Sequence, residues 1–132
     1  MHENLFDFLL FNTRQNGIDI IEVPGHSDDP DLAICQDNVI ILNPNYNERI
    51  TPSFRLAHEL SHILFGSVTE MYAFSPYLKK DEEIIANRNA VKMIAKYAYS
   101  DTPNEYRNWS DFMNEFNLPS WFEPLVKEII YD

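Results

Sequence analysis

Two histidines and a glutamate occur at a spacing that can do metal chemistry. The segment reads His58-Glu59-Leu60-Ser61-His62. Residues four apart on a helix project from one face, so the imidazoles of His58 and His62 can reach a single ion. In such sites the adjacent glutamate does not bind the metal, but accepts a proton from the water that the metal makes acidic. The pattern therefore predicts a zinc-dependent hydrolase, with Glu59 as its general base.

The residues around this motif favour a helix. Thr51 can cap a helix start, and Pro52 suits the first helical position, where its missing N–H costs nothing. Gly66 is a plausible end. Apolar neighbours can bury this helix, namely Leu56, Ala57, Leu60, Ile63 and Leu64. The alternative is a pair of solvated helix histidines that bind no metal.

A third ligand is expected from the next predicted helix, over residues 80–99. A catalytic zinc usually takes three protein ligands and leaves one position open. The helix begins with acidic residues, and Glu83 and Asn87 lie one turn apart. We predict Glu83 as the third ligand and Asn87 as the partner that orients a ligand histidine. Glu82 points about 100° away and is less favoured; favourable interaction with the helix N-terminus would also explain both carboxylates. This arrangement assumes an inward face formed by Ile84, Ala86, Val91 and Ala95.

The elements expected around the two ligand helices indicate an α+β fold. They are an N-terminal helix, a small antiparallel sheet, the motif helix, the second ligand helix and a C-terminal helical pair. The connection at 36–38 is short enough for a hairpin, and residues 67–80 give no clear pattern. The helices are expected at 3–15, 52–66, 80–99, 104–116 and from the turn at 118–120 to 130, and the strands at 18–23, 32–35 and 39–42.

The charge of the chain limits the classes of function. Of its 132 residues 21 are acidic and 10 basic, so the formal net charge is −11. A phosphate backbone repels such a chain, and direct nucleic-acid binding is therefore not expected. A basic protein partner is favoured by the same charge, although ordinary solubility also explains it.

The length fits one domain over residues 1–132. Cys35, the one cysteine, lies in an apolar stretch and is predicted to be a buried structural thiol. The apolar run at 5–11 has no basic start and no cleavage site of a secretory signal. No stretch approaches the roughly 20 apolar residues that span a bilayer. We therefore expect a cytoplasmic protein without membrane contact.

Three segments of the chain resemble the ImmA/IrrE family of metallopeptidases. The resemblance spans roughly residues 18–96, the expected catalytic core, and leaves the C-terminal helices at 104–130 outside it. The three segments occur in the order of the family. They are the strand Val39-Ile40-Ile41-Leu42-Asn43, the helix Phe54-Arg55-Leu56-Ala57-His58-Glu59-Leu60-Ser61-His62-Ile63-Leu64-Phe65-Gly66, and the downstream Glu83-Ile84-Ile85-Ala86-Asn87.

This resemblance implies a minimal thermolysin-like (gluzincin) core that binds Zn²⁺. By position, His58, His62 and Glu83 carry over as ligands and Glu59 as the base. The implied activity is cleavage of a specific protein, a phage or mobile-element repressor that would be a basic helix-turn-helix protein. The chain departs from the family at Ser61, where glycine is common, and in the residues that follow Asn87, without touching the expected ligands.

Two other classes of function stay open. The domain could bind and sequester a repressor or toxin without cleaving it, or the metal could be structural. Glu59 favours catalysis over a structural metal, because a structural zinc needs no general base and normally closes all four positions.

Two further features are less specific. A peptidase needs a donor for the developing negative charge, and the candidates are Tyr72, Tyr77, Tyr97 and His26. The aromatic residues of 104–130 indicate core packing, with a groove for a substrate helix as the alternative.

Overall fold

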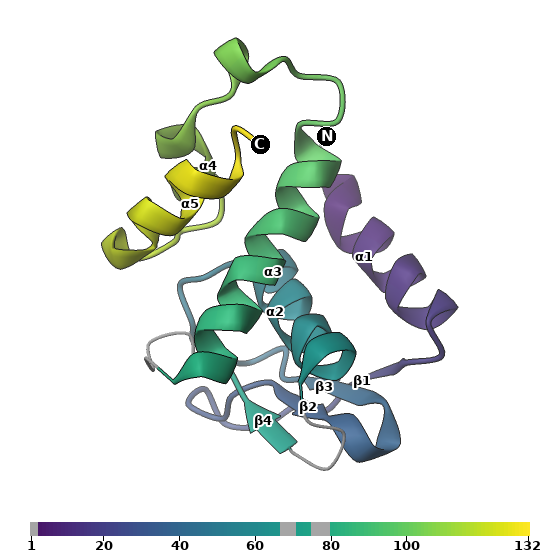
Figure 1. Ribbon diagram of the computed structural model, residues 1–132. Coiled ribbons are helices and arrows are strands. Elements are labelled where there is room, and N and C mark those ends of the chain that lie inside the picture. Colours follow the sequence, from purple (N-terminus) through teal and green to yellow (C-terminus); the bar gives the residue numbers. More distant parts are fainter. Residues whose placement is uncertain (1–2, 67–70, 75–79) are drawn as a thin grey trace.

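The computed structural model describes residues 3–66, 71–74 and 80–132. Helices and a small sheet alternate along this part of the chain, so the predicted α+β class is confirmed (Figure 1). Short 3-10 turns lie at Cys35–Asp37, Asn104–Tyr106 and Ser120–Phe122. The principal elements are α1 (Glu3–Gln15), β1 (Asp19–Glu22), β2 (Leu32–Ile34), β3 (Val39–Leu42), α2 (Pro52–Phe65), β4 (Met71–Ala73), α3 (Asp81–Ala98), α4 (Trp109–Glu115) and α5 (Glu123–Ile129).

The sheet is mixed, and the expectation of an antiparallel sheet is wrong for its first strand. The strand order is β1-β3-β2-β4. β2 and β3 form the predicted antiparallel hairpin, whereas β1 runs parallel to β3, with Asp19 opposite Val39. The loop at 23–31 is long enough to step over one strand position, so β3 inserts between β1 and β2. The apolar pattern of a strand does not encode this choice of neighbour. β4, in a stretch without a clear sequence pattern, pairs with β2 at the edge of the sheet.

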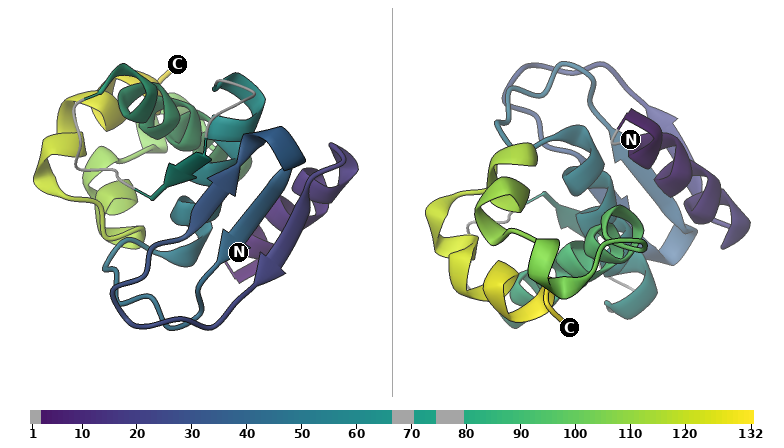
Figure 2. Two further views of the ribbon diagram at one scale, coloured as in Figure 1. Left: turned by 90° about the horizontal axis from the view of Figure 1, so that it is seen from below. Right: turned by 90° about the horizontal axis from the view of Figure 1, so that it is seen from above.

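The helices cover one face of the sheet and then extend away from it. α1 and α2 contact the sheet, α3 packs against α2, and α5 contacts α3 on the side away from α1 (Figures 1 and 2). One apolar core runs through these layers, from Leu5 and Ile40 through Phe54 to Ile94 and Phe122. This packing holds α2 and α3 side by side, and these two helices carry the chemically interesting residues.

The ends of several helices differ from the sequence expectations. Thr51 precedes α2, but its side chain makes no capping hydrogen bond. The single helix expected over 104–116 is instead a 3-10 turn followed by α4, because the Asn108 side chain accepts a hydrogen bond from the Asp111 N–H and starts a new helix. Gly17 ends α1 as expected, with a positive φ of 75°.

The C-terminal aromatic residues divide into two groups. Phe112, Phe116 and Phe122 are buried in the core, as the packing interpretation predicts, while Tyr106 and Trp121 are exposed. Within the described residues, no helix combines the length and the apolar character that a membrane crossing requires.

Candidate metal centre

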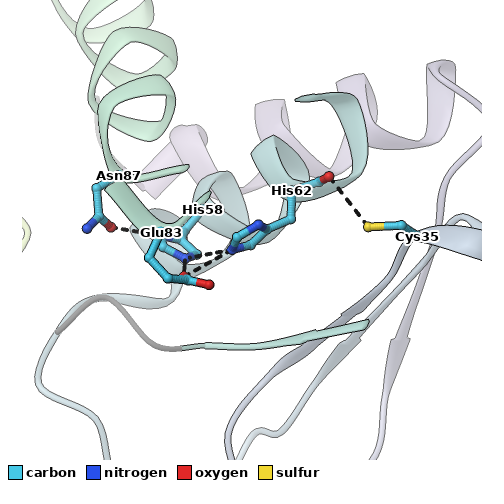
Figure 3. A network of polar contacts seen from close by, with 5 residues as sticks. All are labelled: Cys35, His58, His62, Glu83 and Asn87. Atoms are coloured by element: carbon cyan, nitrogen blue, oxygen red, sulfur yellow. Dashed lines mark hydrogen bonds and ion pairs between the residues drawn. The ribbon is translucent and has the colours of Figure 1, made fainter. Parts of the chain in front are cut away.

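The residues singled out from the sequence meet between two helices. α2 supplies His58, Glu59 and His62, and α3 supplies Glu83 and Asn87. Figure 3 shows these side chains except that of Glu59. All five are buried, with relative exposures of at most 5%. The side chains of His58, His62, Glu83 and Asn87 contact one another because α2 packs against α3.

The inward face of α3 is rotated from the one we expected. Ile84 is 44% exposed, so its assignment to the inward face is wrong. The buried positions at the start of α3 are Glu83, Ala86, Asn87 and Ala90, which are three or four residues apart along one helix face. Because of this rotation, Glu83 and Asn87 are buried where we expected Ile84, and Glu82 is exposed to solvent.

Three potential ligand atoms form a small triangle. His58 Nε2 lies 2.9 Å from Glu83 Oε1, His62 Nε2 lies 3.1 Å from the same oxygen, and the two nitrogens are 3.2 Å apart. Zinc binds such atoms at about 2.0–2.2 Å in a tetrahedron, so neighbouring ligand atoms should lie about 3.3 Å apart. The triangle therefore has nearly the dimensions of one face of a zinc tetrahedron. No other group of His, Cys, Asp and Glu in the described part of the chain converges in this way.

The contact between His58 and Asn87 determines which ring nitrogen of His58 could bind a cation. Its Nδ1 lies 2.8 Å from Asn87 Oδ1, and an amide oxygen can only accept, so Nδ1 carries a proton. Burial lowers the pKa of His58, although contacts with Glu83 and Asn87 act against this, and a second proton is disfavoured. Nε2 of the neutral ring then directs a lone pair at the Glu83 carboxylate. A metal ion between them satisfies all three atoms.

Glu83 is in the form that binds metal. Burial acts to raise the pKa of its carboxyl group, but where the rings of His58 and His62 donate hydrogen bonds to it they outweigh burial and lower the pKa to about 2. The side chain is therefore a carboxylate at neutral pH. A metal ion does not have to displace a proton from it.

Glu59 is in a very different environment, although it is also buried. Neither of its carboxylate oxygens has a hydrogen-bond partner among the described residues. Burial raises its pKa well above the usual range, and the charges of Asp31 and Glu83 act in the same direction. A buried carboxylate without partners costs stability. Its raised pKa suits a general base near neutral pH.

The four candidates for a hydrogen-bond donor to the transition state differ in whether they contact the site. Tyr72 stacks on the imidazole of His62, with ring centroids 3.8 Å apart. Tyr97 instead stacks on Phe8 of α1. His26 belongs to the loop between β1 and β2, and Tyr77 lies outside the described residues. Of the described candidates, Tyr72 is thus the one shown in contact with a ligand histidine.

Sequence reasoning missed two further neighbours of the site. Phe74 packs edge-on against the His58 ring at 4.9 Å. Cys35 is buried as expected, but its thiol also donates a hydrogen bond to the His62 carbonyl oxygen at 3.4 Å (Figure 3). Both contacts depend on how β2 and β4 pack beneath α2. The alternation of Tyr72 and Phe74 was the available signal for a strand here.

Comparisons with known proteins find no relatives for this chain: no family model matches it, and no curated protein or solved structure matches it. What the site can do therefore follows from its own side chains. These are two imidazoles and a carboxylate whose atoms lie close enough to hold a metal ion, and a second carboxyl group without a hydrogen-bond partner among the described residues.

Proposed function

We propose that the chain is a zinc-dependent endopeptidase in which His58, His62 and Glu83 hold the ion and Glu59 is the general base. One observation carries this proposal: three ligand atoms within 3.2 Å of one another lie beside a buried carboxylate without a hydrogen-bond partner among the described residues. A structural zinc normally has four protein ligands and needs no base. Three ligands next to a free carboxylate fit a catalytic centre better.

Each residue has a defined part in the proposed reaction. A bound zinc ion supplies a Lewis acid that makes water acidic near neutral pH and polarises a peptide carbonyl. Glu59 takes the proton of that water at a carboxylate oxygen, and it can return the proton to the leaving amine. Asn87 holds the proton of His58 on Nδ1, so that Nε2 keeps its lone pair for the metal.

The protein substrate we propose is a basic helix-turn-helix repressor of a phage or mobile element, met in the cytoplasm. The net charge of −11 supports a basic partner. The resemblance of residues 54–66 and 83–87 to ImmA/IrrE peptidases supports a repressor as the protein substrate. Because exposed charges are screened beyond about 8 Å at physiological ionic strength, association with such a partner should weaken as salt is added.

Metal analysis of the purified protein tests the ligand set. We expect one zinc per chain, and loss of zinc from His58→Ala, His62→Ala and Glu83→Ala. Glu82→Ala is the matched control, because Glu82 precedes Glu83 in α3 but is exposed. Full zinc occupancy in Glu83→Ala together with loss in Glu82→Ala would show that the third ligand is misassigned.

A cleavage assay tests the reaction. The probes are the candidate repressor, if its gene lies nearby, and a mixed peptide library. Glu59→Gln should retain zinc and fold but cleave about 10²- to 10⁴-fold more slowly, because the amide cannot accept the proton. Cleavage at the wild-type rate would remove Glu59 from the mechanism. If Glu59→Gln still released the repressor from DNA as well as the wild type, the non-catalytic binding module would be the better description.

A further inference from the structure

The two ligand histidines are held in different ways. His58 is oriented by a hydrogen bond from its Nδ1 to Asn87 Oδ1, at 2.8 Å. His62 lies flat against the ring of Tyr72, with centroids 3.8 Å apart and ring planes only 9° from parallel. The separation is shorter than the roughly 4.5–7 Å that aromatic pairs usually show. The aromatic face of Tyr72 therefore contacts His62 in the way that the amide oxygen of Asn87 contacts His58: each restricts the orientation of one imidazole ring.

The strand that carries Tyr72 is placed to support the site. β4 is the edge strand and pairs with β2, where Tyr72 lies opposite Ala33. Side chains two apart on a strand point to the same face. Phe74 directly follows β4 and extends its pairing, because its N–H donates to the Asp31 carbonyl oxygen at 2.9 Å. Its ring meets His58 edge-on at 4.9 Å. One edge of the sheet thus supplies one aromatic ring to each ligand histidine.

The backbone of His62 is fixed independently of its ring. Its carbonyl oxygen accepts hydrogen bonds from the Gly66 N–H at 2.8 Å and from the Cys35 thiol at 3.4 Å. The torsion that rotates an imidazole about its bond to Cβ is broad and weakly restrained by itself. Rotation of the ring would carry Nε2 away from Glu83 Oε1, 3.1 Å distant. A flat contact with a neighbouring ring opposes that rotation.

We propose that Tyr72 is a positioning residue for the metal centre, and that it sets the plane of the His62 imidazole through ring stacking. The inference rests on the proposed metal centre and adds a residue to it. It assigns the effect to the aromatic face of Tyr72 and not to its hydroxyl group. Residues that orient metal ligands in this way typically change metal affinity about 10- to 100-fold when they are removed.

Zinc affinity, measured by competition with a chelator, tests the proposal. Tyr72→Leu should bind zinc about 10- to 100-fold more weakly than the wild type. Tyr72→Phe keeps the ring and should bind within about twofold. Tyr72→Val is a second ringless variant that suits a strand, in case leucine disturbs β4. Tyr97→Leu is the matched control, since it removes a tyrosine stacked on Phe8 instead of on a ligand.

The visible absorption of the Co²⁺-substituted protein reports ligand geometry separately from affinity. Tyr72→Leu should alter this spectrum, whereas Tyr72→Phe and Tyr97→Leu should preserve it. Unchanged affinity and spectrum in both Tyr72→Leu and Tyr72→Val would overturn the inference, as would equal weakening in Tyr72→Phe and Tyr72→Leu. If the wild-type protein itself bound no zinc, the metal centre would be refuted, and the role of Tyr72 with it.

Discussion

Two clusters of buried charge involve α2. The first, which we call the saturated cluster, pairs opposite charges within the chain. Arg55 Nε lies 2.8 Å from Asp31 Oδ2, and Asp31 Oδ1 accepts the Asn43 N–H at 2.9 Å. The Asn43 side chain continues the network, because it accepts from the N–H groups of Gly25 and Asn45 and donates to two carbonyl oxygens of the β1–β2 loop. Opposite charges meet within this cluster, although the Arg55 Nε and Asp31 Oδ2 atoms form an ion pair without hydrogen-bond geometry.

The second cluster is the candidate metal centre, and it contains a carboxyl group without a hydrogen-bond partner among the described residues. His58, His62 and Glu83 bring three electron-rich atoms together, and Glu59 adds an unpartnered carboxylate. Buried charge is costly unless it is paired. The saturated cluster is explained by structure alone, since it fastens the loop to α2. For the unsaturated one, we propose a bound metal ion as the partner.

The largest effect on the free energy of unfolding is expected from zinc, which should act through the metal centre and not through the saturated cluster. A ligand that binds the folded form stabilises it by about 4 kcal/mol at a free concentration of 1,000 times its Kd. We expect a shift of this size in chemical denaturation between zinc-loaded and chelator-treated protein. The His62→Ala variant should show no shift, because it lacks a ligand while the Asp31–Arg55 pair is intact. An equal shift in that variant would place the zinc elsewhere.

Breaking the saturated cluster should destabilise the fold without affecting zinc. Arg55→Met leaves Asp31 buried and unpaired, and removal of one partner of a buried ion pair costs about 3–5 kcal/mol. Adding Asp31→Asn should recover part of this loss, since the amide is neutral and keeps an acceptor for the Asn43 N–H. Urea denaturation measures both variants. A loss below about 1 kcal/mol in Arg55→Met would mean that the pair is solvated.

Removing the unpartnered carboxylate should stabilise the fold, in contrast to the loss of stability expected from Arg55→Met. Glu59→Met should stabilise the metal-free protein by about 1–3 kcal/mol at neutral pH, because a buried group without partners is replaced by an apolar one. The pKa of Glu59 is raised on folding. The folded state therefore holds that proton more tightly, and ionisation costs stability as pH rises above the value for the unfolded chain. The gain in Glu59→Met should accordingly grow between about pH 5 and pH 8. A gain that shrank with rising pH would contradict the unpartnered environment.

The smallest effect is expected from an ion pair on the surface. Arg88 of α3 contacts Glu128 of α5 at 2.6 Å, with both side chains largely exposed. Exposed pairs contribute little, since water and salt screen them. Arg88→Ala should change the urea midpoint far less than Arg55→Met, and the difference from wild type should vanish in about 1 M salt. A salt-independent loss would show that Arg88 stabilises the helix contact by packing.

The candidate ligands were predictable because their spacing is a local property. His58 and His62 share a helix face whatever the rest of the chain does, and Glu83 and Asn87 share another. The sequence did not predict the rotation of α3 that exposes Ile84, nor the parallel pairing of β1 with β3. Both depend on which surface a neighbouring element offers. Zinc binding and peptidase activity stay predictions until they are measured.

By itself, the sequence determined an α+β chain and two helices that each present polar residues on one face, because helical periodicity follows from backbone geometry. Only the tertiary structure decided that these faces meet. His58 and Glu83 are separated by 25 residues, and their 2.9 Å contact exists because α3 packs on α2. The unpartnered state of Glu59 and the stacking of Tyr72 on His62 arise in the same way. Such contacts depend on the distance between elements, which no local pattern of residues specifies.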